Sequence, residues 1–198
     1  IGSCAGKALS SGADNIMMGP LAGKCVTTGY ANIYLGHSAG HGYSSAATGN
    51  NNIALGQGAG YAICCAQHSV FIGTNAGYYN KIGKRNVYIG CGAGRCMGQS
   101  GGADNVALGH CAMRGSSTPG SNTGGSNVSI GEGSGFAITS GSYNVLLGRE
   151  SGCDVTSGQR NILIGTQVQA ASATGNCQLA IGNACLLYTS DAADERLS

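Results

Sequence analysis

The chain has 198 residues, of which 37 are glycine, two are proline and only 9% are charged, and its formal net charge is +2. This composition does not describe an ordinary two-layer domain, and no run of about 20 apolar residues indicates a transmembrane helix. The glycines recur in phase along the chain, so their number does not indicate low-complexity disorder.

A repeat runs along the sequence, with units such as NIYLGHSAG and NVSIGEGSG spaced mostly by 17 residues. The units begin at Asn15, Asn32, Asn52, Ser69, Asn86, Asn105, Asn127, Asn144, Asn161 and Gln178, and a headless copy, IGSCAG, opens the chain. A short fixed period is typical of a solenoid, in which each unit buries apolar surface only against its neighbours. We therefore predict an all-β fold, a parallel β-solenoid of about eleven coils, over residues 1–184.

Both ends of the chain depart from the repeat. The sequence starts at Ile1 in the middle of a unit and without Met, so we expect the true N-terminus to be missing. Residues 185–198, CLLYTSDAADERLS, lose the glycines and the phase. The stretch 185–195 resembles a translated sequencing adapter. We predict that 185–198 is a disordered, non-native tail, with a genuine polar tail as the alternative.

Counting each unit from its first residue as slot 1 makes its pattern clear. Slots 2 and 4 are aliphatic or Met throughout, and this period of two, rich in β-branched residues, predicts a short strand. We expect slots 2 and 4 to face the interior and slot 3, which holds Tyr34, Phe71 and Leu146, to face outward. An apolar outer row is typical of a surface covered by another chain, so we expect an oligomer, with a homotrimer as the simplest closed form.

Glycine occupies slot 5 in every unit, and slot 9 is usually glycine as well. Such positions are typical of corners, where φ is positive or where backbone passes close to backbone. We predict this structural role for the glycines of slot 5, which are Gly19, Gly36, Gly56, Gly73, Gly90, Gly109, Gly131, Gly148, Gly165 and Gly182.

Asparagine dominates slot 1. Its side chain tolerates left-handed backbone and bonds to nearby backbone groups, and copies stacked about 4.8 Å apart can form an amide ladder. We prefer this structural interpretation to a ligand-binding row, which would need exposed and convergent amides. The residues concerned are Asn15, Asn32, Asn52, Asn86, Asn105, Asn127, Asn144 and Asn161.

The second half of the unit is less regular. Slot 12 is apolar in several units, for example Val26 and Ile138, which indicates a second, shorter strand. Insertions of three, two and five residues all fall between slot 9 and the glycine three residues before the next unit, so this part forms surface loops. The largest insertion belongs to the unit 105–127.

No pattern in the sequence indicates catalysis, a metal or a cofactor. The four histidines have no acidic partner in a recurring slot, and Glu132 and Glu150 stand alone. Residues 1–184 hold nine cysteines with no CxxC pair, an odd number that favours small apolar side chains over disulfides or zinc ligands. We expect no enzymatic activity.

The motif NxxxG followed by a small residue, as in NIALGQGAG and NVSIGEGSG, is similar to the head repeats of YadA-like trimeric adhesins. The TTG and TSG spacers resemble the fibre repeats of phage and virus tail fibres. The resemblance implies left-handed coils, a trimer, and an extracellular role on a virion or a bacterial surface. The chain departs from it in its longer units and its many cysteines.

We therefore expect a structural or adhesive fibre segment that carries or spaces a site for a host-surface receptor, either protein or glycan. We expect no binding of nucleic acid and no membrane insertion by this segment. The alternative is a monomeric solenoid that binds ice or carbohydrate.

Overall fold

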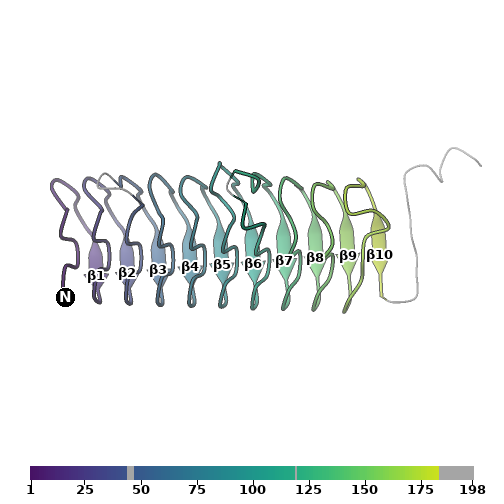
Figure 1. The fold of residues 1–198 in the computed structure, drawn as a ribbon, viewed down its shortest axis with the longest axis horizontal. Coiled ribbons are helices and arrows are strands. Elements are labelled where there is room, and N and C mark those ends of the chain that lie inside the picture. The colour runs from purple at the N-terminus through teal and green to yellow at the C-terminus, as the bar shows by residue number, and fades with distance from the viewer. Residues whose placement is uncertain (44–46, 119, 183–198) are drawn as a thin grey trace, which may run out of the picture.

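The computed structural model describes residues 1–43, 47–118 and 120–182, and these form a parallel β-solenoid (Figure 1). Ten strands of three residues each lie side by side in one sheet, in sequence order. Their bounds are β1 Ile16–Met18, β2 Ile33–Leu35, β3 Ile53–Leu55, β4 Val70–Ile72, β5 Val87–Ile89, β6 Val106–Leu108, β7 Val128–Ile130, β8 Val145–Leu147, β9 Ile162–Ile164 and β10 Leu179–Ile181. The predicted fold class and the position of the strand in the unit are confirmed.

Neighbouring coils are in register. Each residue of a strand pairs with the residue in the same slot of the next coil, as Val87 does with Val106. Backbone hydrogen bonds between coils continue beyond the strands, for example from Gly40 N–H to the carbonyl of Ala59 at 2.9 Å. The headless first copy stacks in the same way, because the carbonyl of Ile1 accepts a 2.8 Å bond from the backbone N–H of Gly19. Ten coils with a strand and one partial coil therefore account for the eleven predicted.

The predicted orientation of the strands is wrong. Slot 3 faces the interior, where Tyr34, Phe71 and Tyr88 are completely buried, while slots 2 and 4 face outward. The period of two shows only that slots 2 and 4 share a face. It does not show which face is the core when all three residues are apolar.

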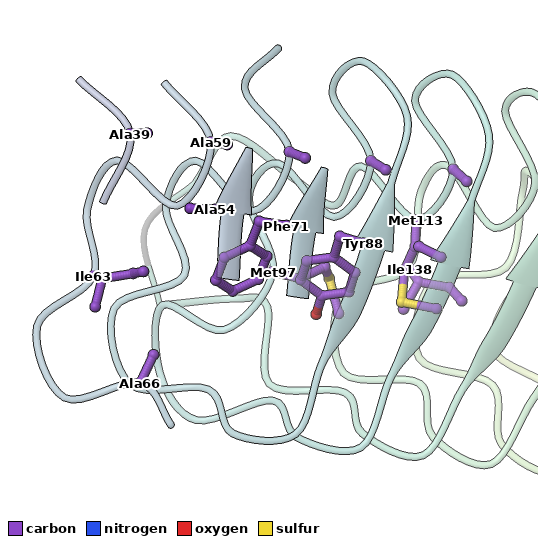
Figure 2. Packing of buried hydrophobic residues seen from close by; sticks show 14 of the residues in the cluster. Ala39, Ala54, Ala59, Ile63, Ala66, Phe71, Tyr88, Met97, Met113 and Ile138 are labelled. Atoms are coloured by element: carbon purple, nitrogen blue, oxygen red, sulfur yellow. The ribbon is translucent and has the colours of Figure 1, made fainter. Parts of the chain in front are cut away.

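The interior accepts large side chains in slot 3 because slot 9 is glycine. A Cβ added to Gly40, Gly77 or Gly94 would collide with the ring of Tyr34, Phe71 or Tyr88. Figure 2 shows the rings of Phe71 and Tyr88 beside one another, with centroids 5.7 Å apart.

The unit with β6 reverses this arrangement. Its slot 3 is the small Ala107, and its slot 9 is Met113 in place of glycine. Both side chains are fully buried in the same cluster, and Figure 2 shows Met113 beside Ile138 in the interior. The larger side chain in slot 9 supplies the volume that the alanine in slot 3 lacks.

The predicted second strand does not form in the described residues. Slot 12 is buried as expected at Val26, Ile63, Ile138 and Val155, but the pairing there amounts to one isolated bridge between Val26 and Ala47. The coils differ in length on this side, so a continuous ladder cannot keep its register. In Figure 1 the loops at this side vary in shape, whereas the turns on the opposite side repeat closely.

The predicted tail, 185–198, lies outside the described residues. The handedness of the coils stays a prediction.

Candidate functional surfaces

The slot-5 glycines form a column in which backbone touches backbone. From Gly19 to Gly148 their φ angles lie between +121° and +132°, and a Cβ on any of them would come within 3 Å of the next glycine of the column. Both predicted reasons for glycine in slot 5, a positive φ and the close approach of backbone to backbone, therefore hold. Gly165 and Gly182 differ, because a Cβ on Gly165 would first meet Val168 and a Cβ on Gly182 would meet no described residue within 4 Å.

The slot-1 asparagines form the predicted amide ladder. The Oδ1 atom of Asn86 accepts bonds from the backbone N–H of Asn105 at 3.0 Å and from its Nδ2 at 3.2 Å. Asn105 Nδ2 also donates to the carbonyl of Gly124 at 3.0 Å, and the Oδ1 of Asn105 accepts from Asn127 in turn.

The ladder is structural and not a ligand surface. Ser69 and Gln178 occupy slot 1 without breaking the sequence of bonds. Every slot-1 asparagine from Asn32 to Asn161 is fully buried, and Asn15 at the first strand is half-buried. Buried amides that bond to one another and to backbone leave no group directed toward a ligand.

The left-handed backbone lies one residue earlier than we predicted. The residue before slot 1 has φ between +53° and +62° in all ten units, and none of these residues is glycine. Ala31, Tyr143 and Arg160 are examples. Each such residue costs about 1–2 kcal/mol of backbone strain, which the ladder on the following residue offsets.

The outward face of the sheet carries two continuous rows of aliphatic side chains, from slots 2 and 4 of β1–β10. Exposed members include Ile16 at 50%, Ile130 at 40% and Ile162 at 42% of their surface. These rows contain no charged or polar side chain in any of the ten described strands. A uniform apolar stripe of this kind is typical of an interface.

A row of aromatic and cationic side chains lies at slot 10, which directly follows the turn of slots 5 to 9. The rings of His41, Tyr61 and Tyr78 stack along the axis, with successive centroids 4.8 and 4.7 Å apart. Arg95 continues the row 5.6 Å from the ring of Tyr78. Burial raises the pKa of the Tyr78 hydroxyl, the nearby Tyr61 and Tyr79 add to this, and Arg95 opposes it.

The slot-10 row was not among the features predicted from the sequence. Its signal is present, because the units place all these residues in one slot. The residue type changes from coil to coil, however, so no single unit shows the row.

A cysteine, a histidine and a glutamate come together on the surface. Cys111 Sγ lies 3.5 Å from His110 Nε2, and His110 Nδ1 lies 3.9 Å from Glu132 Oε1. The prediction that Glu132 and Glu150 stand alone is therefore wrong, since Glu150 also accepts a 2.8 Å bond from Gln167. Cys111, His110 and Glu132 line a hollow of about 240 Å³ together with Phe136.

The environment of this group disfavours nucleophilic chemistry. Burial raises the pKa of the Cys111 thiol, although the reactive form is the thiolate. The backbone N–H groups of Cys111 and Gly133 already donate to carbonyls at 2.9 Å, so they are not oriented to stabilise an oxyanion. That the chain has no enzymatic activity stays a prediction.

Of the nine cysteines in the described ranges, four are exposed, four are half-buried and Cys96 alone is buried. Interior packing by small thiols therefore explains Cys96 and does not explain the four exposed cysteines. Cys4, Cys25, Cys65, Cys91, Cys96, Cys111, Cys153 and Cys177 are free thiols.

Within residues 1–43, 47–118 and 120–182, no three His, Cys, Asp or Glu side chains gather closely enough to hold a metal ion. That part of the chain also contains no helix of a length and apolarity that would cross a bilayer.

Comparison with family models, with curated proteins and with solved structures gives no match. The function proposed for this chain therefore rests on the geometry of the solenoid and on the repeat itself.

Proposed function

We propose that the chain is a structural and adhesive fibre segment that assembles as a homotrimer through the outward faces of its sheets. In this proposal it acts outside the cell, as part of a virion tail fibre or a bacterial surface adhesin, and carries or spaces a receptor-binding site. It needs no cofactor and catalyses no reaction.

The observation that carries the proposal is the aliphatic face of β1–β10. Ten strands at about 4.8 Å spacing and three residues at about 3.3 Å cover roughly 480 Å². A standard interface buries about 800 Å² on each partner, so this face supplies more than half of one. Leaving it in water would cost about 25 cal/mol for each Å² of apolar area.

A closed ring of three chains fits a face that runs along the whole solenoid. In such a ring each chain offers the same stripe to a common axis, and assembly stops when the axis is enclosed. The resemblance of NIALGQGAG and NVSIGEGSG to the repeats of trimeric adhesins and tail fibres supports three chains rather than two.

Multi-angle light scattering of the full chain tests the proposal. A trimer has a mass of about 59 kDa, three times the chain mass of 19.6 kDa. A well-folded monomer over the micromolar range would contradict the proposal.

The second candidate is a monomeric carbohydrate-binding solenoid. It is favoured by the aromatic and cationic row at slot 10, which needs no partner chain. Ice binding is less well supported, because the regular outward face carries aliphatic side chains in place of a hydroxyl ladder. The mass measurement separates the two candidates.

A further inference from the structure

Described residues of the three longest loops of the solenoid line one hollow. The units that begin at Asn32, Asn86 and Asn105 carry the insertions, and their loops contribute Tyr43, Gln99 and Ser117 to its lining. The regular coil that begins at Ser69 adds Tyr79 and Lys81. We define the loop hollow by Tyr43, Tyr79, Lys81, Arg95, Gln99 and Ser117, and its volume is about 340 Å³. Departures from a repeat that meet at one place are typical of a binding site placed on a rigid scaffold.

Two cations of the loop hollow are held against aromatic rings. Lys81 Nζ lies 3.7 Å from the centroid of the Tyr43 ring, and the Arg95 guanidinium lies 5.7 Å from that of Tyr79. Neither cation forms an ion pair with a carboxylate in the described part of the chain. These contacts orient the charges without neutralising them, so both remain able to bind an anion.

The surrounding sequence is free of acidic residues. Between Asp14 and Asp104 the chain has five Lys and Arg residues and no Asp or Glu. The nearer of these two acids, Asp104, is already bound by Arg85 through bonds of 2.6 and 2.8 Å. The field over these coils is therefore positive and attracts anions toward the hollow.

The other groups of the loop hollow suit a sugar. Tyr79, in slot 11, stands at 78° to the neighbouring ring of Tyr78 and is half-buried, so part of its ring is open to a ligand. A tyrosine ring packs against the C–H face of a pyranose, while the amide of Gln99 and the hydroxyl of Ser117 can bond to its hydroxyls. The volume matches one or two sugar units, and two cations match a single negative charge better than a nucleic-acid backbone.

We propose that the loop hollow binds an anionic sugar unit, with Lys81 and Arg95 binding its carboxylate or sulfate and Tyr79 packing on its ring. This inference rests on the proposed adhesive function and assigns a glycan as the receptor class.

The test compares three probes that share one core: 3′-sialyllactose, 6-sulfated lactose and lactose. Binding to the full chain is measured by titration calorimetry and by saturation-transfer NMR. We expect at least one of the two anionic probes to bind about tenfold more tightly than lactose, because charge-assisted bonds are made only to the anion. The better of the two identifies the acidic group.

Variants locate the binding. R95Q and Y79A should each weaken it by about tenfold. Tyr143 and Arg160 form a matched pair elsewhere on the surface, also 5.7 Å from guanidinium to ring, so Y143A and R160Q should leave it unchanged. Circular dichroism checks that all four variants fold.

The proposal is overturned if neither anionic probe binds, if lactose binds equally well, or if R160Q weakens binding as much as R95Q. Competition by hexaglutamate or by a short DNA strand at equal concentration would also overturn the assignment to a sugar. These outcomes are independent of the mass measurement, since a monomer with a functional loop hollow would contradict only the trimer.

Discussion

The two sides of the solenoid are built on different principles. On the strand side, every coil repeats the same outline: a buried polar side chain in slot 1, aliphatic residues in slots 2 and 4, and glycine in slot 5. On the loop side, coil length, charge and side-chain size all change. The period is thus maintained where backbone touches backbone and relaxed where side chains reach solvent. We propose that the regular side serves assembly and that the irregular side serves recognition.

The first prediction has the largest expected loss of stability and compares two glycines with positive φ. In Gly90, φ is +127° and a Cβ would lie 2.5 Å from the carbonyl oxygen of Gly109, whereas a Cβ on Gly101, with φ of +115°, would meet nothing within 4 Å in the described part of the chain. G90A should destabilise the chain by about 4 kcal/mol or more, because backbone overlap adds to strain. G101A adds strain alone and should cost about 1–2 kcal/mol. Urea denaturation measures both, and equal losses would show that backbone contact does not maintain the period.

The second prediction concerns the satisfied amide on the strand side. Replacing Asn105 by Ala leaves the backbone N–H of Asn127 and the carbonyl of Gly124 without their Asn105 partner in the interior. N105A should therefore cost about 2–4 kcal/mol. N105S should cost less, because Ser69 already bridges the ladder in its own coil. Thermal unfolding of the two variants measures both losses of stability. A larger loss of stability for N105S than for N105A would count against the ladder.

The third prediction has the smallest effect and concerns an unsatisfied amide on the loop side. Asn80 occupies slot 12, where five other coils have Val, Ile or Met, and neither atom of its buried amide has a hydrogen-bond partner among the described residues. N80I should stabilise the chain by about 1–2 kcal/mol, since it removes a desolvated polar group. The reverse change, I63N, should destabilise it. A loss of stability in N80I would mean that the amide has a partner that this geometry lacks.

The sequence predicts the strand side in detail and the loop side poorly. Strand positions, the glycine corners and the amide ladder follow from residues that recur in nearly every unit. Which face of the strand points to the interior does not follow. Tyr34 and Ile33 are both apolar, so alternation alone cannot distinguish the core from an interface. The signal that distinguishes the two faces is side-chain size. Size varies in slot 3, where packing within one coil tolerates the change, and it is uniform in slots 2 and 4.

The candidate binding groups were harder to predict for a different reason. Tyr43 occupies slot 12, and Lys81 and Ser117 occupy slot 13, but they come from three coils that are not consecutive. The residue type in these slots changes from coil to coil, so no single unit shows them as a group. The contact of His110 with Glu132 likewise joins neighbouring coils 22 residues apart in sequence. Such contacts depend on where long side chains extend, which the period does not determine.

Sedimentation equilibrium of two matched variants tests most directly whether the aliphatic face of β1–β10 is an interface. I89K places a charge on this face, and T74K places one on an exposed position of the neighbouring coil outside it. Burying an unpaired ammonium at an interface is strongly unfavourable. We predict that I89K sediments as a folded monomer, while T74K and the unchanged chain sediment as trimers. An I89K chain that stays trimeric would show that the aliphatic face is not where the chains meet.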